Sequence, residues 1–438
     1  MKLTRLALAA TLAAAGSGFA ASASAQANEQ FFPLLSYRTG AYAPTGIPWA
    51  NGKQDYIKLV NARDGGINGV KITYEECETG YATDRGVECY ERLKTRPGVA
   101  MVDPLATGIT FALTEKAAVD KIPLMTMGYG LSISQDGKAF KWNFPYRGSY
   151  WTGADILIQH IGKNAGGMDK LKGKKVAYVY HDSPYGKDAI PLIEARAKMH
   201  GFELQLLPVT APGVEQKATW LQVRQSRPDY LLLWGWGAMN ATALKEAQAT
   251  GFPRDKMYGV WWAGTEPTVR DIGEGAKGFH ALSLSGHGTD SKVVQDVLKT
   301  VHGTNQGAGP KDEVGTVLHV HGMIVQMLAI EAVRTAQEKF GKGKVMTGEQ
   351  VRWGMENLKL DQKRIDQLGF TGLMQPMTVT CENHMGSASA RVHTWDGKKW
   401  NYSSDWYQAD AKVLNPLVKA DGDKYLADRK LARRADCN

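Results

Sequence analysis

The stretch KKVAYVYHDSPYGKDAIPLIEARAKMHGFELQLLPV, Lys174–Val209, decides the fold. An apolar run at 176–180 leads into a turn with Pro184 and Gly186, a helical segment follows, and a second apolar run begins after Gly201. This order predicts strand, helix and strand, the unit of parallel sheets. Ligands collect where the strands of such sheets end. The loop there offers a tyrosine and a helix start but no catalytic set, which indicates a pocket that holds a molecule without transforming it.

The alternation of strands and helices continues on both sides of this unit. Repeated alternation of this kind predicts an α/β architecture with parallel sheets flanked by helices. Further strands are predicted at or within residues 31–37, 70–76, 99–104, 123–130, 227–237, 257–264 and 278–287.

Beyond Gly315 the pattern changes. A long apolar helix is predicted first, and a second helix follows at 348–359. The segments 377–384 and 388–404 then alternate like antiparallel strands, with Asp396-Gly397 as a hairpin turn. A charged, helix-prone tail closes the chain.

The N-terminus is typical of a secretory signal peptide. Lys2 and Arg5 precede a short apolar run at 6–15, and Ala23-Ser24-Ala25 forms a small-x-small cleavage site. We therefore expect residues 1–25 to be removed after Ala25 and the mature protein to be periplasmic. No cysteine lies immediately after the cleavage site, where Gln26 stands, so no lipid anchor is expected.

The bulk composition is that of an ordinary soluble protein long enough for two domains. The 438 residues carry 53 basic and 44 acidic side chains, a formal charge of +9 that becomes +7 without Lys2 and Arg5. A basic exported protein could favour anionic ligands, but solubility alone also explains the charge. The basic residues form no stripe with interleaved aromatics, so nucleic-acid binding is not expected.

Four cysteines in an exported chain predict two disulfides. Three pairings are open, and we favour Cys77 with Cys89 and Cys381 with Cys437. A metal site built on Cys381 and His384 is the rival, but it has too few ligands at a recognisable spacing.

Motifs of enzymes are mostly missing. The chain has no Gly-x-Ser-x-Gly elbow, no phosphate-binding loop ending in Gly-Lys-Ser/Thr and no His-Glu-x-x-His. His319 and His321 lie two residues apart in a predicted helix and so point in different directions. A pair of catalytic carboxylates leaves no fixed spacing and stays possible. We expect no metal, no cofactor and no enzymatic activity.

Loops at predicted strand ends carry the candidate ligand contacts. Ala106, Thr107 and Gly108 lie between a strand and a helix, where a hydroxyl and backbone N–H groups suit a carboxylate. A plain helix-capping role for Thr107 explains the residue equally well. Gly128 and Tyr129 occupy the next strand end.

Aromatic residues follow the later strands. We predict that Tyr185, Trp236 and Trp262 line a pocket, and that Trp234 and Trp261 pack between sheet and helices.

These segments together resemble a known family, the type I periplasmic substrate-binding proteins of ABC importers, in the leucine/isoleucine/valine-binding branch. The resemblance covers roughly residues 31–407. The segments that carry it are TGAYAPTG (39–46), NARDGGINGVKI (61–72), LATG (105–108), IPLMTMG (122–128), VYHDSPYGKDA (179–189), RPDYLLLWGWG (227–237) and GEGAKGFHALS (273–283).

The resemblance implies two α/β lobes that close on a ligand, joined by three crossovers near Gly148, Gly278 and Thr371. Lobe 1 would comprise 27–148 and 279–370. Lobe 2 would comprise 149–278 and 371–438, including the C-terminal hairpin and tail.

The family's ligand contacts map onto the strand-end residues named above, Ala106, Thr107, Gly108, Gly128, Tyr129, Tyr185, Trp236 and Trp262. Amino-acid binders of the family also hold the ligand's ammonium with an acidic residue after the next strand. The matching segment here is Trp261-Trp262-Ala263-Gly264, and its nearest acid is Glu266, further along. An unpaired buried ammonium costs several kcal/mol, so a ligand without an amine is favoured.

The prediction is therefore a monomeric periplasmic solute-binding protein of an ABC importer, with a permease and ATPase complex as partner. Its expected ligand is an aromatic or apolar carboxylate. Branched-chain amino acid or amide binding remains an alternative. An exported hydrolase or a ligand-sensing subunit is the alternative from another class.

Overall fold

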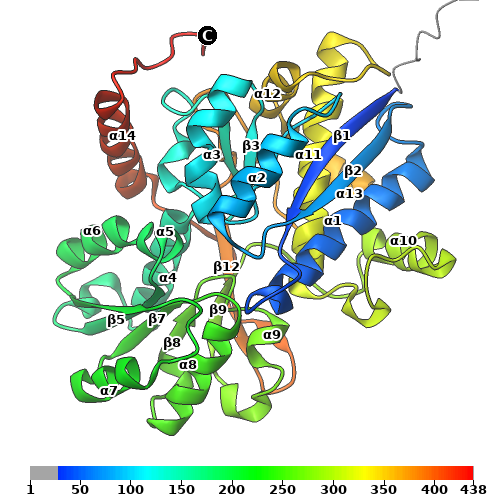
Figure 1. The fold of residues 1–438 in the computed structure, drawn as a ribbon. Helices are drawn as coiled ribbons and strands as arrows, with labels where there is room; N and C mark the ends of the chain where they lie inside the picture. Colours follow the sequence, from blue (N-terminus) through cyan, green and yellow to red (C-terminus); the bar gives the residue numbers. More distant parts are fainter. Residues whose placement is uncertain (1–27, 438) are drawn as a thin grey trace, which may run out of the picture.

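The computed structural model describes residues 28–437, and the expected signal peptide lies outside them. Two lobes, each built on its own sheet, lie one above the other in the view of Figure 1. The predicted α/β architecture with helix-flanked parallel sheets is confirmed.

The sheet of the first lobe is parallel. β1 (Glu29–Ser36) pairs with β2 (Lys71–Glu78), and β3 (Leu124–Met127) pairs with β4 (Asn143–Tyr146). The segment 99–103 joins these two pairs through single bridges from β1 and to β3. Its helices are α1 (Ala43–Asp64), α2 (Thr83–Leu93), α3 (Thr107–Asp120), α10 (Lys292–Thr300), α11 (Val317–Phe340), α12 (Gly348–Glu356) and α13 (Gln362–Leu368).

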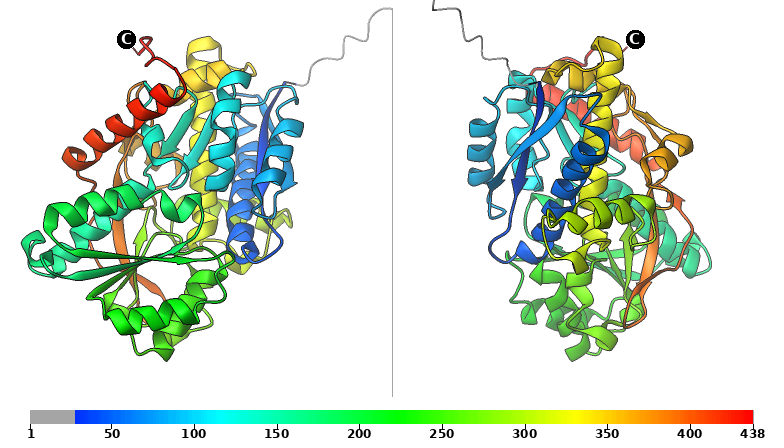
Figure 2. Two further views of the ribbon diagram at one scale, coloured as in Figure 1. Left: turned by 60° about the vertical axis from the view of Figure 1, so that its left-hand side comes forward. Right: turned by 90° about the vertical axis from the view of Figure 1, so that its right-hand side faces the viewer.

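Two glycines let α1 and α11 pack closely along one another. A Cβ on Gly52 of α1 would lie 2.0 Å from the carbonyl oxygen of His319, and one on Gly322 of α11 would lie 2.2 Å from that of Trp49. Among the described residues, α11 alone is long and apolar enough to cross a membrane, but 89% of its apolar window is buried inside the protein. It is the central helix of this lobe's core (Figure 2).

The second lobe contains the predicted strand–helix–strand unit. β5 (Lys175–His181) runs parallel to β6 (Glu203–Val209), with α6 (Ile190–His200) between them and the short α5 (Pro184–Lys187) in the loop. The sheet order is β13-β12-β9-β8-β7-β5-β6, and β14 also pairs with β12. The remaining elements are α4 (Tyr150–Asn164), α7 (Lys217–Ser226), β7 (Tyr230–Trp234), α8 (Ala238–Ala249), β8 (Met257–Gly259), α9 (Glu266–Val269), β9 (His280–Ser283), β12 (Ser389–Trp395), β13 (Trp400–Tyr402) and β14 (Tyr407–Gln408).

The hairpin predicted at Asp396-Gly397 is present, because β12 and β13 are antiparallel and Trp395 pairs with Trp400. β12 is also antiparallel to β9. An antiparallel hairpin thus extends the edge of a parallel sheet.

The chain first passes from one sheet to the other at Gly148, between β4 and α4. β9 pairs with β8 and β12, so the chain stays in the second lobe to Ser283, beyond the expected crossover at Gly278. The short β10 (Lys359–Leu360) and β11 (Met377–Thr378) pair within the first lobe, which puts the third crossover between β11 and β12 and after Thr371.

The C-terminal helix α14 (Ala411–Asp428) packs against the first lobe (Figure 2), while its N-cap residue Asp410 donates its backbone N–H to Asp155 of the second lobe at 2.7 Å. The Tyr425 ring packs 4.4 Å from the ring of Phe140, and an ion pair of 2.6 Å joins Arg433 to Asp136. Helical periodicity predicts such a helix but does not say which surface receives it.

Both favoured disulfides are present. Cys77 of β2 bonds to Cys89 of α2, and Cys381 bonds to Cys437 in the tail. The second bond ties the end of the chain to the first lobe.

Candidate functional site

A small cavity lies between the lobes at the carboxyl ends of their strands. Its volume is only about 10 Å³. Ligand pockets are commonly about 300–1,000 Å³, so the lobes are closed tightly on a narrow space. The lining residues are Tyr37, Trp49, Tyr81, Leu105, Ala106, Thr107 and Tyr129 from the first lobe, and Tyr150, Tyr185, Trp236 and Trp262 from the second.

Six of the eight predicted contact residues line this cavity, and two do not. The two exceptions are Gly108 and Gly128. Gly108 lies in the first turn of α3, just behind Thr107. The Gly128 carbonyl accepts a hydrogen bond of 2.9 Å from Nε1 of Trp261, which positions the loop from behind.

Five lining residues were not predicted. Tyr37 directly follows β1, so the strand-end rule that found Tyr185 also applies to it. Tyr150 begins α4 after the first crossover. Trp49 projects from the second turn of α1, and Tyr81 lies in the β2–α2 loop. Leu105 completes the list. No local pattern marks Trp49 as a ligand contact.

The aromatic rings pack against one another across the interface between the lobes. Trp49 of the first lobe stacks on Trp262 of the second, with ring centres 5.0 Å apart and planes 24° from parallel. The Trp236 ring lies edge-on to both, 6.4 Å from Trp49 and 5.3 Å from Trp262. Behind them His321 of α11 packs 4.6 Å from Trp49, and burial lowers the pKa of His321 to about 3. The wall is therefore apolar and uncharged.

A buried ion pair supports the floor of the cavity. Nζ of Lys53 lies 2.9 Å from Oδ2 of Asp103, and both side chains are only 2% exposed. The Tyr129 hydroxyl donates to the other oxygen of Asp103 and accepts from the backbone N–H of Leu105 at 2.7 Å. Leu105 has a left-handed backbone, φ +60°, which this network holds in place. The Tyr129 hydroxyl is thus fully occupied, and only its ring is free to contact a ligand.

Three hydrogen-bond donors of the wall have no partner among residues 28–437. They are the Tyr37 hydroxyl and the indole N–H groups of Trp49 and Trp236, and all three side chains are at most 3% exposed. Burial, then nearby Tyr81, raises the pKa of Tyr37 well above its usual value, so the hydroxyl keeps its proton. The Trp236 N–H lies close enough to oppose that shift, yet no hydrogen bond joins the two groups. An unpaired buried donor costs about 1–3 kcal/mol, which an acceptor atom in the cavity would recover.

No acidic or basic side chain lines the cavity in the described part of the chain. Glu266, the acid nearest in sequence, begins α9 and accepts a hydrogen bond of 3.2 Å from the backbone of Val317. Its burial raises its pKa. It borders a different groove, so it offers nothing to a ligand in this cavity.

Further polar contacts join the lobes beside the cavity. The Tyr42 hydroxyl of the first lobe lies 2.7 Å from Nε2 of His181 at the end of β5. Ser132 of the first lobe donates its backbone N–H, at 3.2 Å, and its hydroxyl to the Asp188 carboxylate of the second. Burial lowers the pKa of His181 to about 4 and raises the pKa of Asp188 to about 7. These contacts stabilise the closed arrangement.

Comparison with known proteins gives a consistent result. The sequence matches the model of a family described as periplasmic binding protein over residues 29–399. No curated protein matches it. It is similar to a crystal structure described as an ABC transporter permease from the Pseudomonas fluorescens group, with 40% identity and a TM-score of 0.87, covering 94% of this chain and 100% of that one.

More distant structures share the fold. A branched-chain amino acid ABC transporter structure from Thermus thermophilus with bound valine has 20% identity and a TM-score of 0.72, covering 88% of this chain and 99% of that one. A solute-binding protein of an ABC transporter from Rhodopseudomonas palustris BisB5, in complex with 3,4-dihydroxybenzoic acid, has 18% identity and a TM-score of 0.68, covering 87% and 98%.

Proposed function

The chain belongs to the periplasmic binding protein family, and from this premise we propose that it is the solute-binding component of an ABC importer, with a small aromatic or apolar carboxylate as its ligand. The family and the two-lobed fold expected from the sequence are confirmed. The observation that carries the ligand class is the cavity wall, in which eight aromatic side chains surround three unpaired donors and no charged group.

The unpaired hydrogen-bond donors of the wall indicate which head group the ligand carries. A carboxylate is a strong acceptor, and hydrogen bonds to a charged acceptor contribute about 1.5–3 kcal/mol each. The N–H of Trp236 and the Tyr37 hydroxyl approach each other without bonding, so one oxygen placed between them accepts from both. Thr107 adds a third polar group beside the N-terminus of α3. The stacked Trp49 and Trp262 rings suit a flat apolar body.

A branched-chain amino acid is the second candidate, because a similar structure holds valine. Its ammonium needs an anionic or carbonyl partner. The buried Asp103 carboxylate behind the lining residue Tyr129 is already bonded to Lys53 and Tyr129. This arrangement disfavours a free amine and leaves an amide as the closer alternative.

The proposed mechanism has no covalent step. The ligand enters when the lobes separate, because the closed cavity is too narrow to admit it. The first lobe supplies the Thr107 loop and Trp49, and the second closes Trp236 and Trp262 over the ligand. Closure completes the Tyr42–His181 and Ser132–Asp188 contacts and creates the surface that the permease recognises.

Ligand screening on the mature protein tests this proposal. The protein is unfolded and refolded to remove any bound ligand, and tryptophan fluorescence and thermal unfolding are followed with benzoate, dihydroxybenzoate, short fatty acids, leucine, valine and amides. We expect a carboxylate without an amine to bind most tightly and to raise the melting temperature. Preferential binding of leucine or valine would show that the ligand class is wrong, and conversion of any bound compound would show that the protein is an enzyme.

A further inference from the structure

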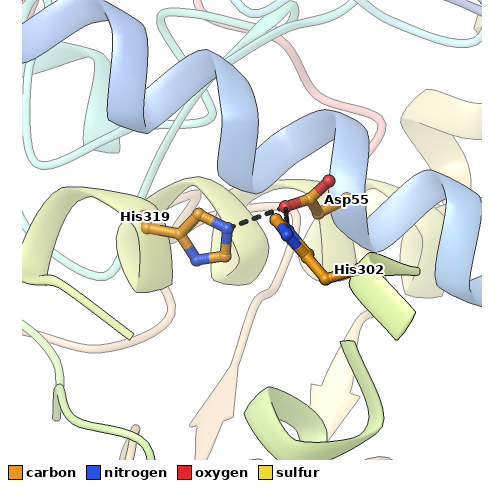
Figure 3. Close-up of side chains that lie close together, drawn as sticks. All are labelled: Asp55, His302 and His319. Carbon is orange, nitrogen blue, oxygen red and sulfur yellow. Dashed lines mark hydrogen bonds and ion pairs between the residues drawn. The ribbon is translucent and has the colours of Figure 1, made fainter. Parts of the chain in front are cut away.

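A second cluster of polar side chains lies inside the first lobe, apart from the ligand cavity. Asp55 comes from α1, His302 from the short η5 (His302–Thr304) and His319 from α11 (Figure 3). Nε2 of His302 lies 2.8 Å and Nε2 of His319 lies 3.0 Å from the same Asp55 oxygen, Oδ2. The three ligand atoms lie within 4.8 Å of one another. Three separate segments thus converge on one point.

No lysine or arginine within residues 28–437 pairs with Asp55. The other Asp55 oxygen accepts a hydrogen bond of 2.8 Å from the backbone N–H of Ala308. The side chains of Asp55 and His319 are 1% exposed, and that of His302 is 5% exposed. A buried carboxylate is costly unless a positive charge compensates it, and here either a protonated imidazole or a metal ion held by neutral imidazoles supplies that charge.

We propose that Asp55, His302 and His319 form a binding site for a divalent transition-metal ion, with Zn²⁺ as the best match. Two imidazoles and one carboxylate are a typical zinc donor set, and a water molecule completes the four-coordinate shell. No local pattern predicts this site, because His319 and His321 diverge along α11 and Asp55 lies more than 200 residues from both histidines of the cluster.

The His319 ring is able to change from hydrogen-bond donor to metal ligand. In the arrangement drawn in Figure 3, the two Nε2 atoms donate to Asp55. A neutral histidine that ligates through Nε2 carries its proton on Nδ1 instead. Nδ1 of His319 has no partner among the described residues, so moving the proton there breaks no other hydrogen bond.

The site is also close to solvent. Residues 303–306, which follow His302, are exposed, so the cluster lies just beneath the surface. Gly307 lets the loop pack directly on the His302 ring, because a Cβ there would lie 2.4 Å from it. The ion would join the 302–308 loop to α1 and α11 and so stabilise the first lobe, independently of the ligand cavity.

Metal titration of the mature protein, prepared without a polyhistidine tag and treated with EDTA, tests the proposal. Zn²⁺ is added during calorimetry and during thermal unfolding. We expect one equivalent to bind and the melting temperature to rise. In His302→Gln and in Asp55→Asn, we expect affinity to fall at least about tenfold and the rise to disappear. His200→Gln, on α6 of the other lobe, is the matched control and should behave as the native protein.

Two results of the Zn²⁺ titration would overturn the proposal. If Zn²⁺ raises the melting temperature equally in the native protein and both variants, or if no saturable equivalent binds, the three side chains are only a hydrogen-bonded cluster. If Asp55→Asn does not fold, the Zn²⁺ titration of His302→Gln, which changes a residue next to an exposed loop, decides between the two outcomes. If neither variant folds, Co²⁺ added to the native protein decides, because only a low-coordinate site gives strong visible absorption, and a spectrum like that of aqueous Co²⁺ refutes the site.

Discussion

The unpaired donors of the cavity wall allow the contribution of a single residue to ligand affinity to be tested. Trp236→Phe removes one N–H and keeps an aromatic ring. If that N–H donates to a carboxylate, the loss of about 1.5–3 kcal/mol lowers affinity by about 10- to 150-fold. Calorimetric titration with the tightest ligand from the screen measures the change.

Trp234→Phe is the matched control for this experiment. Nε1 of Trp234 is also buried and unpaired, but the side chain does not line the cavity. We expect its affinity to stay within about twofold of native, since no donor to the ligand is lost. If Trp236→Phe and Trp234→Phe bind the ligand equally well, Trp236 does not donate to it.

The buried pair Lys53–Asp103 permits a second prediction. Lys53→Met leaves the Asp103 carboxylate buried with the Tyr129 hydroxyl but no cation. Breaking a buried pair in this way costs about 3–5 kcal/mol, which urea unfolding should detect. Lys53→Met combined with Asp103→Asn removes both charges and should recover much of the loss. If the double variant is no more stable than Lys53→Met alone, the unpaired charge is not the cause.

At the scale of elements, the α1–α11 contact depends on glycine. Gly322→Ala places a Cβ 2.2 Å from the Trp49 carbonyl oxygen, and the backbone there yields only by separating the helices. Overpacking of this kind costs about 1–3 kcal/mol. Thermal unfolding measures this loss. Ligand binding should weaken as well, because Trp49 moves with α1.

Gly422→Ala in α14 is the control, since its new Cβ would meet only side-chain atoms, the nearest being a carboxylate oxygen of Asp136 at 3.1 Å. Alanine is the better helix former by up to about 1 kcal/mol, so this variant should be as stable as the native protein or slightly more stable. Equal stability of Gly322→Ala and Gly422→Ala would contradict the close approach of α1 and α11.

The sequence predicted those elements whose apolar pattern is local. The βαβ unit at 174–209 and the hairpin at Asp396-Gly397 follow directly from alternation and turn residues, and both are present. β9 continues the second sheet past Gly278 because it pairs with β12, more than 100 residues away in the chain. α14 belongs to the first lobe because of Phe140 and Asp136. Such pairings depend on distant partners, which no local pattern contains.

The same distinction explains the cavity. Thr107, Tyr185, Trp236 and Trp262 lie where strands or strand-end loops finish, so the geometry of parallel sheets predicts them. Trp49 reaches the cavity from a helix, and its place is set by how α1 packs on α11. The unpaired donors could be identified only from the structure, because hydrogen-bond partners do not occur at any fixed spacing in the sequence.

At the scale of the whole molecule, closure of the lobes is coupled to two proton equilibria of opposite sign. Asp188 has its pKa raised by burial to about 7 in the closed form, so closure takes up a proton between its ordinary pKa of 3.8 and about 7. His181 has its pKa lowered by burial from 6.5 to about 4, so closure releases a proton between those values. If both groups have ordinary pKa values when the lobes are open, the two effects nearly cancel between pH 4 and 6.5.

Variants that lack one of the two groups should therefore show a pH dependence of ligand affinity that nearly cancels in the native protein. In His181→Gln, only Asp188 titrates, so ligand affinity should fall as pH rises from 5 to 7, approaching tenfold per pH unit, and level off above 7. In Asp188→Asn, only His181 titrates, so affinity should rise from pH 5 to 6.5 and then level off. Calorimetry with a ligand that stays ionised throughout measures these slopes. Parallel pH profiles in both variants would show that neither contact is linked to closure, because a slope shared by both must come from another group or from the ligand.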